Sequence, residues 1–284
     1  MKNIFTWSHV PLYFLLLIVL PTVGTALALY LLVFEGMIAW SDILIFAVMY
    51  VITELGVTVG YHRMLVHQSF QTSGVVKFIF LMLGSMTMQG PAITWASNHL
   101  KHHAFTDDNE DPHSPTIKGW LHAHFGWIFS ITSDEVEGAR QVFGKKFLRD
   151  KLVVFMNKTF FLWVVLGFVI CYLVGGWTGL LWGGFVRLFF TLHVTWSVNS
   201  ICHMFGSRLF NTADESRNNF WIGLLAMGEG WHNNHHAFPR SAFHGMRWWQ
   251  IDFSGYLIRL LEKLHLVRNV YRVPNHVLAE KAVK

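Results

Sequence analysis

The chain has 284 residues, of which 53% are hydrophobic and only 14% charged, and its formal net charge is +5. Soluble domains carry about 25% charged residues, so this composition excludes a disordered chain, and two cysteines exclude a disulfide scaffold or an iron–sulfur protein. Seventeen histidines stand against this apolar background. The mild positive charge is interpreted as a guide to membrane topology rather than as a sign of nucleic-acid binding.

Long apolar runs predict the first elements. Residues 10–34 contain no charge, and about 20 apolar residues span a bilayer, so this run predicts a first transmembrane helix. Residues 40–61 predict a second. The run 78–95 is apolar but is interrupted by Gly84, Gly90 and Pro91. Two further spans are expected at 159–175 and 178–202, separated by a glycine-rich turn.

The placement of Lys and Arg predicts the topology. The connections around 35–42 and 175–179 contain neither residue, whereas the polar blocks 62–158 and 203–284 hold nearly all of them. Because basic residues favour the cytoplasmic side, both blocks and both chain ends should be cytoplasmic. The run 78–95 should then be a helix that lies in or on one leaflet without crossing. We expect one all-α integral membrane domain over residues 1–284. It should have four transmembrane helices in two hairpins, one interfacial helix and a cytoplasmic helical cap.

Eight histidines fall into three clusters near predicted membrane boundaries. The clusters are His62 and His67, then His99, His102 and His103, then His232, His235 and His236. Residues at i, i+3 and i+4 share one helix face, and imidazole is the commonest metal ligand in proteins. A single buried histidine is more often an ordinary core residue, but two HxxHH boxes and a further pair favour a metal site. Eight nitrogens exceed the four that zinc needs and suit two octahedral metals.

These boxes carry a specific resemblance. The segments Gly60–Arg63, Asn98–His103 and Gly228–Pro239 resemble the three histidine boxes of membrane fatty acid desaturases, and most closely the delta-9, acyl-CoA-desaturase-like branch. The segments Asp111–Ser114 and Thr195–His203 match in the same order, so the resemblance covers about residues 56–252.

The resemblance implies a diiron centre in the cytoplasmic cap. Its expected ligands are His62, His67, His99, His102, His103, His203, His232, His235 and His236, with Asn199 reaching one iron through water. Residues expected to orient these imidazoles are Glu229, Asp111 and His113, with Asp107 and Asp108 also considered and a solvated acidic loop as the alternative for both. An acyl tunnel is expected to be lined by Thr195, Trp196, Gln89 and Trp95, although ordinary helix packing would also explain Thr195 and Trp196. Roles for His122, His124 and His244 stay open.

The function implied is an O2-dependent desaturase of the bacterial inner membrane that forms a cis double bond, delta-9 by resemblance, in a saturated acyl chain. Acyl-CoA, acyl-lipid and acyl-carrier substrates stay open, because the positions near the second box where animal relatives have phosphate-binding arginines read Ser97 and Thr116–Lys118. Electrons should come from a separate ferredoxin or small b-type cytochrome with its reductase. Its docking surface is predicted at Lys145, Lys146, Arg149 and Lys151, where lipid binding is the alternative. The rival functions are a related diiron hydroxylase and a non-catalytic metal-binding protein or transporter.

Overall fold

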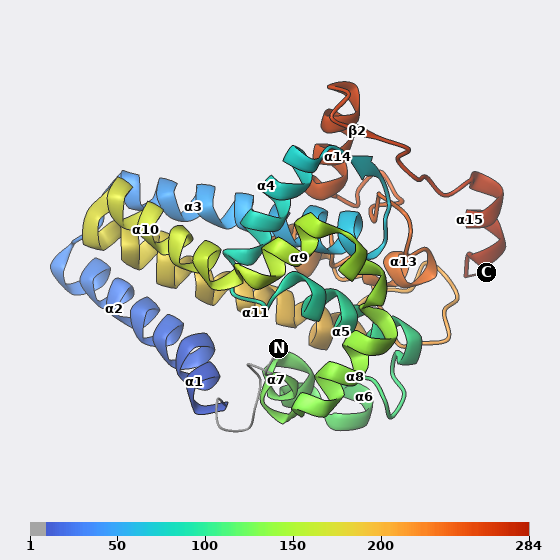
Figure 1. Ribbon diagram of the computed structural model, residues 1–284, viewed down its shortest axis with the longest axis horizontal. Coiled ribbons are helices and arrows are strands. Elements are labelled where there is room, and N and C mark those ends of the chain that lie inside the picture. Colours follow the sequence, from blue (N-terminus) through green and yellow to red (C-terminus); the bar gives the residue numbers. More distant parts are fainter. Residues whose placement is uncertain (1–9, 284) are drawn as a thin grey trace.

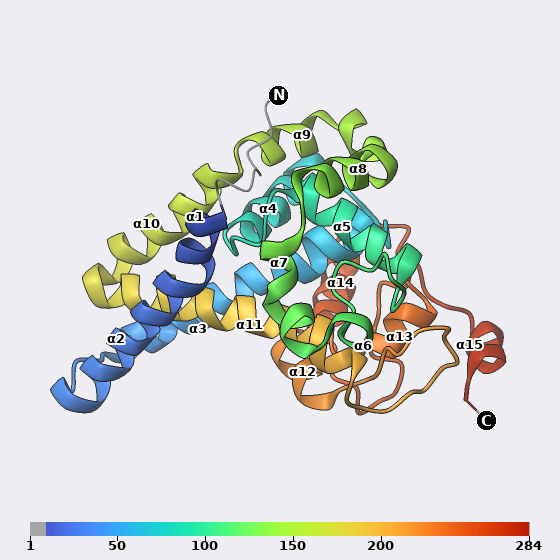
Figure 2. The same cartoon turned by 90° about the horizontal axis from the view of Figure 1, so that it is seen from below.

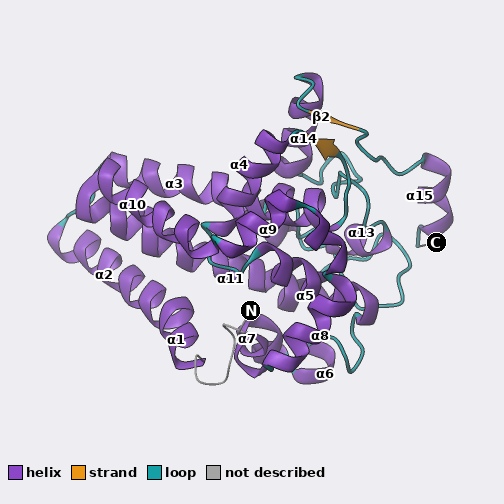
Figure 3. Ribbon diagram, viewed as in Figure 1, coloured by secondary structure: helices purple, strands orange, loops and turns teal. Residues whose placement is uncertain are grey.

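The computed structural model describes residues 10–283, and helices make up most of them (Figure 3). The longest helices, α2, α3, α10 and α11, lie together at one end of the molecule, and the short helices and loops gather at the other end (Figures 1 and 2). The predictions for the two chain ends concern residues 1–9 and 284, which lie outside the described residues.

The first two predicted spans are continuous helical stretches. Helix α1 (Val10–Phe14) continues through a wide turn, η2 (Leu15–Val19), into α2 (Leu20–Glu35), which ends at Gly36. Gly36 has φ 62°, the left-handed conformation that commonly ends helices. Helix α3 (Trp40–Leu55) begins where Asp42 accepts a hydrogen bond from the backbone nitrogen of Ala39, and it continues into η3 (Gly56–Val66).

The second apolar block folds back on itself. It consists of α10 (Phe160–Gly179), η6 (Leu180–Val186), α11 (Arg187–Ser200) and η7 (Ile201–His203). Gly176 interrupts the first helix with φ 59° and ψ −146°, a conformation open essentially to glycine alone. Beyond the interruption the chain returns along α10, because a Cβ added to Gly183 would lie 2.8 Å from Cys171 Sγ.

Within residues 10–283, three helical stretches are long and apolar enough to cross a membrane. They are Pro11–Glu35, Trp40–Val66 and Phe160–His203, the last with 44 residues and the reversal at Gly176. The chain is therefore a membrane protein in composition and helix length, and the four-span topology with its cytoplasmic orientation stays a prediction.

The prediction of one helix over 78–95 is wrong. The structure has two helices, α4 (Gly74–Ser85) and α5 (Ala92–Phe105). Between them Met88 and Gly90 have φ 59° and 108°, and Pro91 precedes α5, so the helix cannot continue. Helix α4 has 12 residues and a length of about 18 Å, less than the roughly 30 Å of a bilayer core.

The remaining elements surround the site at the end of the long helices. They are α6 (Pro115–Lys118), η4 (His122–Gly126), α7 (Trp127–Ser130), α8 (Ser133–Phe143), η5 (Lys145–Arg149), α9 (Lys151–Lys158), α12 (Phe220–Leu225), α13 (His232–Ala237), α14 (Phe253–Lys263) and α15 (Asn275–Lys281). A two-residue antiparallel ladder joins β1 (Gln71–Thr72) to β2 (Val267–Arg268). A buried apolar cluster holds η3, α4, α5, α9 and α14 together, and so fixes the elements that carry the first two histidine boxes.

Candidate metal centre

The nine histidines predicted as ligands come from distant parts of the chain. They meet at the end of the long helices that faces the short helices and loops. His62 lies in η3 and His67 follows it, α5 carries His99, His102 and His103, η7 ends at His203, and α13 carries His232, His235 and His236. They meet in two separate groups whose candidate ligand atoms lie within 4.8 Å of one another in each group.

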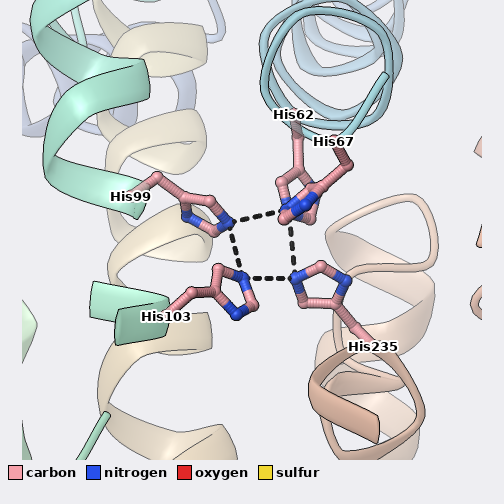
Figure 4. A group of neighbouring side chains, drawn as sticks. All are labelled: His62, His67, His99, His103 and His235. Atoms are coloured by element: carbon pink, nitrogen blue, oxygen red, sulfur yellow. Dashed lines mark hydrogen bonds between the residues drawn. The ribbon is translucent and has the colours of Figure 1, made fainter. Parts of the chain in front are cut away.

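The first group, here called the five-histidine group, contains His62, His67, His99, His103 and His235 (Figure 4). Its Nε2 atoms face one another. The Nε2–Nε2 distances are 3.1 Å for His62–His235, 3.1 Å for His67–His99, 3.0 Å for His99–His103 and 2.9 Å for His103–His235. Side chains from α5 close one side of the ring, and η3 and α13 close the other.

The second group, here called the four-histidine group, contains His102, His203, His232 and His236. Its Nε2 atoms also converge. The distances are 3.0 Å for His203–His232, 3.0 Å for His232–His236 and 3.4 Å for His102–His236. On α5 the HxxHH spacing places His99 and His103 in the five-histidine group and His102 in the four-histidine group. On α13 it places His232 and His236 in the four-histidine group and His235 in the five-histidine group.

Carboxylates contact the Nδ1 atoms of four of these imidazoles, whose Nε2 atoms face the centre of each group. The pairs are His102 Nδ1 to Asp111 at 3.0 Å, His203 Nδ1 to Asp107 at 2.9 Å, His236 Nδ1 to Asp214 at 2.9 Å and His62 Nδ1 to Glu229 at 2.7 Å. A carboxylate that accepts the Nδ1 proton fixes the tautomer and leaves the Nε2 lone pair for a metal. Three pairs belong to the four-histidine group and one to the five-histidine group.

The site is strongly biased toward neutral imidazoles. Burial, and then the neighbouring histidines, lower the pKa of most of these histidines well below the ordinary value, as for His67, His99, His102, His232, His235 and His236. For His103 the same causes lower the pKa to about 3. Burial alone would raise the pKa of Glu229, but His244, His62 and Arg63 outweigh it and hold that pKa well below its usual range. Neutral imidazole is the form that binds a metal.

The donor set fits a bound cation. Nδ1 of His102 lies 3.0 Å from Asp111 and Nδ1 of His236 lies 2.9 Å from Asp214, so each ring in its neutral form gives its Nδ1 proton to a carboxylate. Their Nε2 atoms must therefore both carry lone pairs, yet these atoms lie 3.4 Å apart and face each other. Two lone pairs in such contact repel unless a positive ion lies between them, so the four-histidine group suits a metal ion.

A buried arginine links the first box to the third. Arg63 is fully buried and donates to Glu229 Oε1 from Nε and Nη2, to both oxygens of Asp252 and to the carbonyl oxygen of Ala242. His244 Nδ1 lies 3.1 Å from Glu229 Oε2. The sequence interpretation missed Arg63 and Asp252, although the position of Arg63 directly after His62 was a usable signal.

Other predicted residues have different positions. His113 packs against His102, with ring centroids 4.3 Å apart, and its Nδ1 lies 3.7 Å from Asp111. Asp108 accepts from the backbone nitrogen of Asn109 in its own loop and has no contact with a histidine among the described residues. His122 contacts the carbonyl oxygen of Pro112, and His124 contacts Ser200 and His193, so neither joins the two groups.

An apolar cavity leads to the histidines. All four predicted tunnel residues line it, and so do His99 and Asn199. Gln89 donates to Thr195 Oγ1 at 2.9 Å and accepts from Trp95 Nε1 at 3.2 Å, which fixes three side chains in its wall. Trp196 is buried and belongs to an apolar cluster, several members of which also line the cavity. The geometry therefore leaves an apolar cavity beside the candidate metal sites.

Comparison with known proteins agrees with this geometry. The family model described as fatty acid desaturase matches residues 38–259. Hex-5-enoyl-[acyl-carrier protein] acetylenase of Moorena producens is 39% identical over 278 residues, covering 91% of this chain and 85% of that protein. The sn-1 stearoyl-lipid 9-desaturase of Anabaena variabilis is 38% identical over 234 residues (82% and 85%). An acyl-CoA 5-desaturase of Anemone leveillei is 39% identical over 244 residues (86% and 75%).

Proposed function

The chain belongs to the fatty acid desaturase family and is an oxidoreductase of lipid metabolism, and on this premise we propose that it introduces a cis double bond into a saturated acyl chain with two histidine-bound iron ions and O2. The observation that carries the proposal is the pair of convergent Nε2 groups beside an apolar cavity. The five-histidine group would hold one iron. The four-histidine group would hold the other, with Asn199 near it through water.

The iron ions would supply the oxidising power that no side chain has for removing hydrogen from an unactivated methylene. The residues of this chain do the positioning. The hydrogen-bonded set of Gln89, Thr195 and Trp95 fixes the wall of the cavity and hence the path of the acyl chain past the histidines. Asp111 and the other three carboxylates keep the imidazoles in one tautomer.

The head group would lie in a polar hollow that adjoins the apolar cavity. The two share Trp127 and Ile131 in their linings, and the hollow adds Lys101, Lys118, Glu110, Glu135 and further polar groups. Its cations are balanced by acidic side chains, which supports a singly charged lipid or carrier phosphate at least as well as the several phosphates of acyl-CoA. The names of the three relatives specify a carrier protein, a lipid and CoA, so the same three substrate classes stay open for this chain.

The electron donor is proposed to dock beside the five-histidine group. Lys146 donates to the carbonyl oxygen of Val66, the residue before His67, and Lys145 beside it is exposed. A basic surface this close to a ligand suits an acidic ferredoxin or a small b-type cytochrome, because opposite charges speed association and orient the encounter.

The test is expression in a host that lacks desaturases, with iron supplied and a donor system present, followed by gas chromatography of the cellular fatty acids. A new monoene in place of the saturated chain is expected, with delta-9 as its predicted position, and His103→Ala should abolish it. A hydroxylated chain without a monoene would instead support the related hydroxylase. Metal accumulation without any new lipid would support the non-catalytic alternative.

A further inference from the structure

Polar side chains recur in two rows along the two helical stretches that lead from the histidines into the apolar helices, and Glu54, Thr58, His62, Thr195 and Asn199 among them line a cavity. Along α3 and η3 the row is Glu54, Thr58 and His62, and along α11 and η7 it is Arg187, Thr191, Thr195, Asn199 and His203. Every step is four residues, so consecutive members of each row are neighbours on the helix surface. Polar side chains at such depth in an apolar helix are costly and usually functional.

Glu54 and Thr58 share a cavity with the candidate metal sites. This cavity is lined by both residues, by His62 and His232 and by further histidines. It adjoins the acyl cavity, because Trp95, His99, Thr195 and Asn199 line both. An acyl chain that passes the histidines and continues inward therefore comes to Glu54, about 12 Å along the helix from His62 at 1.5 Å per residue.

Three polar atoms of the two rows have no hydrogen-bond partner within residues 10–283, and of the three residues Glu54 lines the cavity. They are Oε2 of Glu54, Nη2 of Arg187 and Oγ1 of Thr191, and all three residues are buried. Arg187 donates instead to the carbonyl oxygens of Gly183 and Met86, and no ion pair joins it to Glu54 in this part of the chain. A methyl-ended chain would leave the Glu54 oxygen desolvated and unpaired, which is unfavourable.

We propose that the inner end of the cavity binds a hydroxyl group on the distal half of the acyl chain, with Glu54 accepting its hydrogen bond. The inference rests on the proposed desaturase function and names the substrate class of that same site. A hydroxyl offers one donor and two lone pairs, so it can donate to Glu54, whose Oε2 has no partner among the described residues. Selectivity then arises because the unsubstituted chain leaves a buried acceptor unpaired.

The test compares pairs of chains of equal length, one unsubstituted and one with a single hydroxyl moved stepwise along the distal half to the last carbon. Iron-loaded protein with its donor system receives each pair at equal concentration, and the monoene products are counted by mass spectrometry. Binding is measured separately on iron-free protein through the fluorescence of Trp95 and Trp196 in the cavity wall. At one hydroxyl position the hydroxylated chain should give about ten times more product and bind about ten times more tightly than the plain chain, a difference of about 1.4 kcal/mol.

Variants separate the specific contact from general packing. Glu54→Leu removes the acceptor and should reverse the preference in favour of the plain chain, while Glu54→Gln keeps an acceptor and should retain part of it. Thr53→Val is the matched control, since Thr53 is a buried neighbour whose hydroxyl bonds to the carbonyl oxygen of Met49 and which does not line the cavity. It should leave the ratio unchanged.

The following results would overturn the inference. One is equal binding and turnover of plain and hydroxylated chains at every position, and the other is an unchanged ratio in Glu54→Leu. A shorter plain chain that outcompetes every hydroxylated one would also overturn it. If no chain of either kind gains a double bond, the proposed function fails, whereas a monoene from plain chains without a hydroxyl preference overturns this inference alone.

Discussion

Glu229→Gln tests whether the carboxylates behind the histidines govern metal binding. Both oxygens of Glu229 are in use. Oε1 accepts from Arg63 at 3.1 and 3.2 Å, while Oε2 lies 2.7 Å from His62 Nδ1 and 3.1 Å from His244 Nδ1. Glutamine has one acceptor oxygen and one NH2 group, so in either orientation an N–H donor faces another N–H donor.

The magnitude follows from what each partner loses. Changing a group that orients a ligand costs about 10- to 100-fold in metal affinity, or about 1.4 to 2.8 kcal/mol. The free energy of unfolding falls by less than the loss of a whole buried ion pair would cause, because Arg63 keeps its hydrogen bonds to Asp252 at 2.9 and 3.0 Å. We expect about 1–3 kcal/mol of lost stability, the cost of one unsatisfied buried donor, and a folded protein.

The assay is iron retention per chain during titration with a chelator. Glu229→Gln should release one of two equivalents at a lower chelator concentration, since it affects only His62 in the five-histidine group. Asp214→Asn is the matched control, because Asp214 contacts His236 in the four-histidine group. It should release the other equivalent, and the double variant should release both early. Retention of both equivalents with wild-type affinity in folded Glu229→Gln would refute the reasoning, as would parallel loss of both.

Three further predictions follow from single side chains. Gln89→Leu removes the hydrogen bond to Thr195, so the chain path should loosen, and mass spectrometry of derivatised products should show a wider spread of double-bond positions; one sharp position would contradict this. Gly176→Ala should lower the melting temperature in detergent through about 1–3 kcal/mol of backbone strain, while Gly138→Ala, which has open space around it in a helix, should not. Burial lowers the pKa of His124 to about 4, so the unfolded chain binds more protons between pH 6.5 and 4 and stability falls as the pH falls through that window. His124→Gln should flatten this part of the curve of melting temperature against pH, and an unchanged slope would show that His124 does not contribute.

The sequence predicts the long helices and the histidine boxes for the same reason: both are encoded in local spacing. Uncharged runs of about 20 residues specify span-length helices, and the candidate span Pro11–Glu35 agrees closely with the predicted 10–34. The helix predicted at 78–95 is wrong because apolar composition outweighed the backbone signals. Gly90 and Pro91 were visible in the sequence, yet the positive φ of Met88 that completes the break was not.

The carboxylates behind the histidines were only partly predictable. Asp111 and Glu229 lie within or next to the boxes and were expected. Asp214 comes from a loop 22 residues before His236 and has no pattern that distinguishes it from a solvated acidic residue. Asp252 pairs with Arg63 across 189 residues. Partners of this kind are set by tertiary folding, and one sequence does not encode them in any local period.

The uneven distribution of carboxylates makes the two candidate metal positions chemically different. A carboxylate that accepts the Nδ1 proton raises the basicity of the imidazole and makes Nε2 a stronger donor. The four-histidine group has one ligand fewer but three such pairs, through Asp107, Asp111 and Asp214, whereas the five-histidine group has one, through Glu229. Stronger donors therefore offset the smaller number at the four-histidine position. That position could hold a metal with one coordination place to spare, which the proposed O2-dependent desaturation would require.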